Sequence, residues 1–310
     1  MTRAAGLKTA IAAFMTRQRI PGEMEQNLVK EAIHLHLLSA LSDAGILRHV
    51  AFQGGTALRL CYGGERYSED LDFVCGKSGS YLDDVEFADL VDAAVDATKR
   101  SLQREFDVDP SRITVRAPQD PSIIREADAT VATWQIVVPV TSTPRSPTSR
   151  TKIEFANVPS YDNGPRMVRA TPGLVQVQDV ILAVESPQEI LADKAVAIVA
   201  RSAMKHRDLW DVWFLTNRYD AHIDRETVRR KFADYGTTDV ESKARNRLEE
   251  LAQATTTKGF LDEMRRFLPA KRIAEVSSSG LHHAILAESG ELIRRGVLPV
   301  TEDTEDGRLR

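Results

Sequence analysis

Residues 52–74, FQGGTALRLCYGGERYSEDLDFV, restrict the possible folds of this chain more than any other segment. A short apolar strand leads into a Gly-Gly-Thr turn at residues 54–56, a helix start follows, and two aspartates separated by one leucine come next. Side chains alternate along an extended strand, so Asp70 and Asp72 share one face and the neighbouring apolar residues share the other. The stretch therefore predicts strand, turn, helix and a second strand with two converging carboxylates.

Close carboxylates repel each other unless a cation lies between them, and a divalent metal is the usual solution. Mg²⁺ or Mn²⁺ takes one or two carboxylates together with phosphate oxygens. The turn formed by Gly54, Gly55 and Thr56 can supply the phosphate side, because glycines permit a close approach and helix N-termini bind anions. Alone, an Asp-x-Asp pair more often marks a solvated strand face and a Gly-Gly pair a plain turn. Their order within about twenty residues is the stronger signal.

A third acidic residue, Glu154, lies in TKIEFANV between Ile153 and Phe155. This repeats the alternation around Asp72, and a third carboxylate would complete a two-metal site. The alternative is a half-exposed strand in which Lys152 and Glu154 share the solvated face.

The segment PQEILADKAVAIVA predicts a helix whose start is marked by a capping box, Ser186 with Glu189. Lys194 lies next to the apolar stripe of this helix and not on the opposite, polar face. Such a lysine either extends its ammonium to solvent or points into a pocket where it meets a phosphate. The next helical segment, HRDLWDVWFL, contains Asp211. Asp211 either pairs with Arg207 four residues earlier or orients Lys194 or Arg207.

Periodicity divides the chain into four parts. Residues 1–48 are helix-like, residues 49–184 form an α/β module, residues 185–300 are helical, and residues 301–310 form a charged tail that we expect to be flexible. A segment rich in Pro and Ser at 141–150 predicts a hairpin loop. Helices of the second half beyond the one with Lys194 are predicted at 205–218, 225–235, 240–253, 258–267 and 282–295.

Composition excludes several classes of protein. The 310 residues are 42% hydrophobic and 28% charged, which suits one large or two modest globular domains. We find no apolar run of membrane-spanning length and no signal-peptide core, so we expect a cytoplasmic protein without a membrane partner. The net charge of −4 argues against a surface that binds nucleic acid all over. Basic pairs in the second half leave two alternatives, a local basic face or solvated helix surfaces. Nothing in the sequence suggests a coiled coil; the expectation is a monomer, although the sequence does not determine the oligomeric state.

Four segments in this order and spacing, GGTALRLCYGGERYSEDLDF, KIEF, PQEILADKAVAIVAR and HRDLWDVWFL, resemble the AbiEii/MenT family of nucleotidyltransferase-like toxins. This family is a branch of the DNA polymerase β superfamily, and the resemblance spans roughly residues 20–220. It implies an α+β fold, with a polymerase β-like nucleotidyltransferase core of mixed sheet and flanking helices, followed by an α-helical C-terminal half. It also implies a toxin with a cognate antitoxin, and several members block translation by adding nucleotides to the tRNA acceptor end.

Carried over residue by residue, the resemblance implies roles for the motif residues. The phosphate-binding set is the glycine turn with the serine before the first aspartate: Gly54, Gly55, Thr56 and Ser68. Asp70 and Asp72 would bind the metal, and Glu154 is the third and least uniform acid of the family. Lys194 matches a nucleotide-contacting lysine, and Asp211 matches a later essential aspartate.

The leading hypothesis is therefore an Mg²⁺- or Mn²⁺-dependent enzyme that transfers a nucleoside monophosphate from an NTP to RNA, with the tRNA 3′ end as acceptor. Two alternatives stay open, nucleotidylation of a protein and a catalytically idle module that binds nucleotide or a partner. Phosphorylation of Ser68 would add about −1.5 to −2 charges beside the carboxylates, and we expect it to block nucleotide binding.

Overall fold

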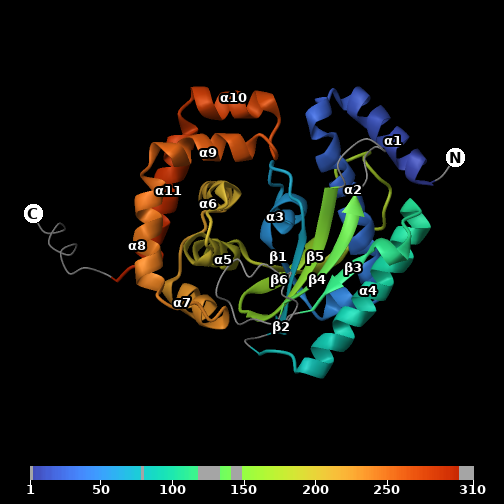
Figure 1. Cartoon of the computed structure of the whole chain (residues 1–310), viewed down its shortest axis with the longest axis horizontal. Coiled ribbons are helices and arrows are strands. Elements are labelled where there is room, and N and C mark those ends of the chain that lie inside the picture. Colours follow the sequence, from blue (N-terminus) through green and yellow to red (C-terminus); the bar gives the residue numbers. More distant parts are fainter. Residues whose placement is uncertain (1–2, 78–79, 118–132, 141–148, 300–310) are drawn as a thin grey trace, which may run out of the picture. The chain divides into compact units, whose positions relative to one another are not determined.

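The computed structural model describes residues 3–77, 80–117, 133–140 and 149–299 (Figure 1). The chain divides into two compact units, which are treated separately below. The first unit comprises the described residues up to Ser186 and a later segment, Arg265–Ile273; the second comprises residues 187–264 and 274–299. Most of the predicted hairpin loop, residues 141–148, and the charged tail lie outside the described residues.

A mixed sheet forms the centre of the first unit. Within the described residues it has seven strands in the order β3-β4-β5-β2-β1-β7-β6. The strands are β1 (Ala51–Gln53), β2 (Leu71–Lys77), β3 (Thr114–Arg116), β4 (Thr133–Val140), β5 (Ser149–Ser160), β6 (Asn163–Met167) and β7 (Ile181–Glu185). The pairs β1/β7 and β2/β5 are parallel, and the other neighbours are antiparallel. The predicted mixed sheet is confirmed.

Four helices belong to this unit: α1 (Arg3–Gln18), α2 (Glu25–Asp43), α3 (Gly54–Tyr62) and α4 (Asp84–Phe106). Helices α1, α2 and α4 pack against one another beside the sheet, and α3 contacts β1 and β2 (Figure 1). Asp83 caps α4 by accepting hydrogen bonds from the backbone N–H groups of Val85 and Glu86. Three short 3-10 helices, Gly22–Met24, Ile46–Arg48 and Pro110–Arg112, connect these elements.

A row of phenylalanines fixes which face of the central strands is buried. Phe52, Phe73 and Phe155 are register partners on β1, β2 and β5 and are at most 1% exposed. Their rings stack with centroid distances of 5.1 Å and 5.3 Å. Such aromatic pairs add about 0.5–1.5 kcal/mol beyond their buried area. Because side chains alternate, the residues next to these phenylalanines point to the opposite face of the sheet.

The second unit is helical, as predicted. Its helices are α5 (Pro187–Ala200), α6 (His206–Tyr219), α7 (Arg225–Asp234), α8 (Val240–Leu251), α9 (Ala254–Met264) and α11 (Leu281–Gly296). Helix α10 (Ala270–Ser278) begins in the first unit and ends in the second, and it is not among the predicted helices. It has only nine residues, with Ile273 and Val276 as its buried apolar pair, which is too short for a clear periodic signal. None of the described helices is long and apolar enough to cross a bilayer.

Candidate active site

Two of the predicted carboxylates are neighbours in the sheet. Asp72 on β2 is in register with Glu154 on β5 and with Gln53 on β1. All three residues lie on the face opposite to the phenylalanine row. Asp72 is half-buried, and the side chain of Glu154 is 32% exposed. The structure therefore brings Asp72 and Glu154 together on an accessible face.

The glycine turn faces these groups. Gly54 begins α3 with a φ of +75°, and a Cβ at this residue would lie 2.6 Å from Oδ2 of Asp72. A Cβ at Gly55 would lie 2.3 Å from Nη2 of Arg66 and 2.9 Å from Oγ of Ser68. A larger residue at either position would have to displace these groups. Neighbouring groups therefore leave no room for a side chain at either glycine of the turn, and Ser68 lies against the turn.

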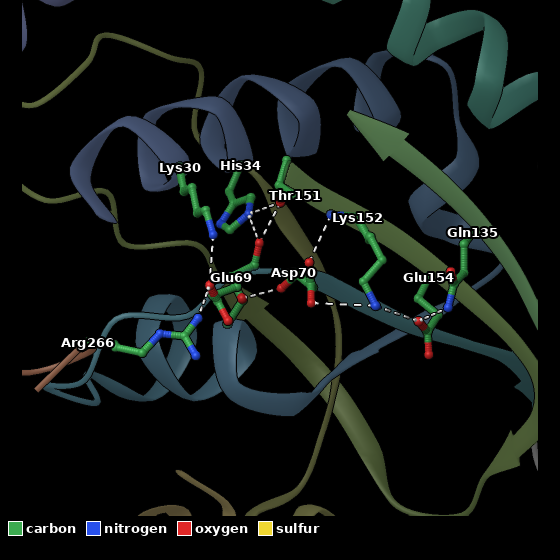
Figure 2. A network of polar contacts seen from close by, with 10 residues as sticks. Lys30, His34, Glu69, Asp70, Gln135, Thr151, Lys152, Glu154 and Arg266 are labelled. Carbon is green, nitrogen blue, oxygen red and sulfur yellow. Dashed lines mark hydrogen bonds and ion pairs between the residues drawn. The ribbon is translucent and has the colours of Figure 1, made fainter. Parts of the chain in front are cut away.

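Asp70 immediately precedes β2, and Figure 2 shows the contacts that surround it. The hydroxyl of Thr56 donates to the Asp70 carbonyl, and the backbone N–H of Lys152 donates to Oδ1 of Asp70 at 2.9 Å. The ammonium of Lys152 lies 3.9 Å from Oδ2 of Asp70 and 3.7 Å from Oε2 of Glu154. Gln135 donates to the same Glu154 oxygen at 2.9 Å. One ammonium therefore faces two of the predicted metal-binding carboxylates.

Glu69, the residue before Asp70, is held by side chains from distant parts of the chain (Figure 2). Its Oε1 accepts from Lys30 at 2.8 Å and from Arg266 at 3.1 Å. Its carbonyl accepts from the Thr151 hydroxyl at 2.5 Å and lies 3.1 Å from Nε2 of His34. Burial lowers the pKa of His34 to about 4, so its imidazole is neutral at pH 7. Sequence reasoning identified none of these four partners.

Lys194 and Asp211 lie in direct contact within the second unit. The Lys194 ammonium is 2.6 Å from Oδ1 of Asp208 and 2.7 Å from Oδ2 of Asp211, and Arg201 also pairs with Asp208. The side chains of Lys194, Asp208 and Asp211 are 10%, 3% and 2% exposed. Burial alone would raise the pKa of Asp208, but the charges of Lys194, Arg201 and Arg207 outweigh it and hold that pKa well below its usual range. Asp208 was not predicted.

A comparison with protein-family models decides the family. The model described as "Nucleotidyl transferase AbiEii toxin, Type IV TA system" matches residues 36–279, which is most of the chain. This chain belongs to the AbiEii family. The predicted family is confirmed: the protein is a nucleotidyltransferase toxin of a type IV toxin–antitoxin system, and membership implies an NTP substrate and an antitoxin partner.

Solved structures add only a weak similarity. The chain resembles the crystal structure of JHP933 from Helicobacter pylori and that of a proposed nucleotidyltransferase from the same organism. Each is 17% identical with a TM-score of 0.41, and the alignments cover 87% of this chain and 91% and 94% of those chains. No curated protein matches the chain. At this TM-score the two structures support no conclusion about the site.

Nucleotidyltransferases of this kind generally use a divalent cation, and the AbiEii site has suitable donors. Within the described residues, no three His, Cys, Asp or Glu side chains are grouped so as to hold a metal by themselves. Mg²⁺ at nucleotide sites, however, usually takes one or two carboxylates and completes its shell with phosphate oxygens and water. Asp70 and Asp72 would supply such carboxylates, and the ammonium of Lys152 shows that a cation can lie between Asp70 and Glu154. The residues therefore fit a cation that shares its coordination with the nucleotide.

The loop that leads to Asp70 in this AbiEii protein is also held by the segment Arg265–Ile273, which belongs to the same unit. The backbone N–H of Tyr67 donates to the carbonyl of Phe267 at 3.0 Å, and Nη2 of Arg272 lies 2.9 Å from Oε1 of Glu65. Phe267 is 1% exposed. Residues far along the chain thus position the loop that carries Ser68 and Asp70.

Proposed function

We propose that this AbiEii-family toxin is an Mg²⁺-dependent enzyme that transfers a nucleoside monophosphate from an NTP to RNA, with the tRNA 3′ acceptor end as preferred acceptor, and so blocks translation. The observation that carries the proposal is the register of Asp72 with Glu154 beside the turn of Gly54 and Gly55. One compact unit then supplies both the metal ligands and the phosphate cradle. Mn²⁺ has the same preference for carboxylate oxygens and can replace Mg²⁺.

The reaction follows from the chemistry of these groups. The RNA 3′ oxygen forms a bond to the α-phosphorus while the bond from that phosphorus to the bridging oxygen breaks, and pyrophosphate leaves. Glu154 accepts the proton of the attacking hydroxyl. Asp70 and Asp72 hold the divalent cation, which supplies charge neutralisation when bound. Ser68 and the first N–H groups of α3, including the backbone N–H of Thr56, form the phosphate side, while the Thr56 hydroxyl holds the Asp70 carbonyl.

The roles of Lys194 and Asp211 extend the same proposal. Lys194 neutralises the triphosphate, as its match to the nucleotide-contacting lysine of the family implies. Asp211 and Asp208 fix the direction of the Lys194 ammonium through their contacts of 2.7 Å and 2.6 Å. Such partners hold a functional group in one geometry without touching the substrate.

The choice of RNA as acceptor rests on the family resemblance and not on a basic face. The predicted basic pairs largely face acids: Arg229 and Arg230 pair with Glu226, Arg266 with Glu69, Arg272 with Glu65, and Arg294 and Arg295 with Glu291. Lys231 is fully buried against Glu189 and Asp193. These pairs favour the alternative of ordinary helix surfaces.

The test is transfer of labelled nucleotide. The purified protein is incubated with Mg²⁺, bulk tRNA and each labelled NTP in turn, and label is measured on RNA and on protein. Asp72→Ala removes the central carboxylate, and Asp92→Ala, at an exposed position of α4, is the matched control for loss of one acid. We expect label on tRNA in the wild type and in Asp92→Ala, and none in Asp72→Ala.

Two other outcomes would overturn the proposal in different ways. Label on protein alone would establish nucleotidylation of a protein target by the same site. An absence of label with every NTP, while the protein still binds NTP, would indicate an idle module.

A further inference from the structure

Lys152 differs from the other lysines that contact carboxylates near the site. Its side chain is 35% exposed, and its ammonium lies 3.9 Å and 3.7 Å from the carboxylates of Asp70 and Glu154. These distances exceed those of a hydrogen bond. In contrast, Lys30 contacts Glu69 at 2.8 Å with a side chain that is only 6% exposed. The Lys152 ammonium therefore acts as a charge between two carboxylates and is not locked to either.

The two carboxylates have anchors that do not depend on this ammonium. Asp70 accepts a hydrogen bond from the backbone N–H of Lys152 at 2.9 Å, and Glu154 accepts one from Gln135 at 2.9 Å. The backbone bond persists whatever side chain residue 152 carries. The ammonium can therefore leave without releasing Asp70 or Glu154. If the ammonium left, the negative charges of Asp70 and Glu154 would no longer be neutralised, and another cation could take over that role.

We propose that Lys152 is a displaceable counter-ion of the metal site. It neutralises Asp70 and Glu154 while no divalent cation is bound, and it moves to the triphosphate when the cation and nucleotide enter. No covalent bond changes: a divalent ion takes the place of one ammonium at the carboxylates, and the ammonium neutralises a phosphate. The inference rests on the proposed function, because it takes Asp70 and Asp72 as the metal ligands.

This arrangement links metal binding to nucleotide binding. A metal that arrives alone must displace the ammonium without providing a phosphate to receive it. A metal that arrives with NTP brings the phosphates that receive the ammonium. The nucleotide should therefore strengthen metal binding, and by linkage the metal should strengthen nucleotide binding by the same factor.

The experiment measures binding of Mn²⁺, alone and with a non-hydrolysable NTP analogue, from the electron paramagnetic resonance signal of free Mn²⁺. Lys152→Met removes the charge and keeps much of the length of the side chain, and Lys152→Arg keeps the charge. Lys271→Met, at an exposed position of α10, is the control for the change in net charge. Thermal unfolding of each variant confirms that it is folded.

We expect Lys152→Met to lower the Kd for Mn²⁺ alone by roughly three- to tenfold, since two partly exposed charge pairs are involved. The same variant should show a smaller gain in Mn²⁺ affinity on adding the analogue. Lys152→Arg and Lys271→Met should behave like the wild type.

Two results would overturn the inference, and Asp72→Ala separates them. Mn²⁺ binding that is lost in Asp72→Ala but equally strong in the wild type and Lys152→Met would refute the counter-ion role alone. Mn²⁺ binding that persists in Asp72→Ala would place the ion elsewhere and refute the metal site as well.

Discussion

Replacement of Lys194 by methionine tests whether the cluster around this lysine holds the second unit together. In the native protein the ammonium contacts Asp208 at 2.6 Å and Asp211 at 2.7 Å, and both carboxylates are nearly inaccessible to water. Lys194→Met would leave Asp211 buried without this cation, although Arg201 would still pair with Asp208. Breaking a buried ion pair by removal of one partner costs about 3–5 kcal/mol. We expect the free energy of unfolding of this unit to fall by that amount.

Urea unfolding at pH 7 measures this change, followed by tryptophan fluorescence. Two of the three tryptophans of the chain, Trp210 and Trp213, lie on α6 beside the cluster, and Trp210 is 1% exposed. With an m-value of about 2 kcal/mol per M, the midpoint should fall by roughly 1.5–2.5 M. The double variant Lys194→Met/Asp211→Asn removes the buried negative charge that had faced the Lys194 ammonium. It should therefore be more stable than Lys194→Met, with a coupling energy above about 1 kcal/mol.

An unchanged unfolding midpoint in Lys194→Met would refute this reasoning. It would mean that the contacts of Lys194 with Asp208 and Asp211 contribute nothing to the second unit, which would leave nucleotide contact as the role of the lysine. Transfer of labelled nucleotide, measured well below the unfolding midpoint of the variant, separates the two effects. Activity lost in a fully folded Lys194→Met protein would support the proposed contact with the triphosphate.

Three further predictions concern pH and the glycine turn. Because the pKa of Asp208 is lowered in the folded state, the second unit should keep its stability above about pH 5 and lose it as the pH falls through and below about 4; urea unfolding of Asp208→Asn should show a flatter pH profile. Burial lowers the pKa of His34 to about 4 in the folded state, against about 6.5 when unfolded, so the free energy of unfolding of the first unit should fall by up to about 3 kcal/mol as the pH is lowered from 6.5 to 4. Urea unfolding at a series of pH values measures this change, which should be smaller in His34→Gln. Gly55→Ala should cost about 1–3 kcal/mol through overpacking and weaken binding of a fluorescent NTP. Gly164→Ala, where a Cβ would meet nothing within 4 Å, should leave NTP binding unchanged.

The parts of the site that sequence predicted are those fixed by local geometry. A two-residue alternation was enough to place Asp72 on a face opposite to the apolar residues, because residues 71–74 of β2 keep a constant register with β5, and residues 72–74 also do so with β1. The turn at Gly54 and Gly55 was also predictable from sequence, since only glycine tolerates the close approach of another group at these two positions. Arg66 also lies beside the turn, but it belongs to the loop before β2, where the alternation of a strand does not apply.

The partners that sequence could not predict act across long separations. Glu69 is bonded to Lys30, 39 residues before it, and to Arg266, 197 residues after it. Periodicity describes which face of an element is buried, but it does not specify which distant element supplies the opposing charge. Asp208 shows the same limit at shorter range: its spacing from Asp211 was visible, yet nothing in the helix itself specified that Lys194 lies between the two carboxylates.

The loop that carries Ser68 and Asp70 is held in place by residues 265–273, which lie outside the carboxylate motif. Asp70 takes its direction from the chain on both sides of it, and on the N-terminal side that chain is fixed through Glu69 and Tyr67 by Arg266 and Phe267. A related chain with every motif of residues 52–74 but without these partners would present the same carboxylates on a loop without these restraints. Catalysis by positioned charges is sensitive to displacements of about 1 Å. The geometry of the carboxylate motif therefore depends on residues 265–273 as well as on the motif itself.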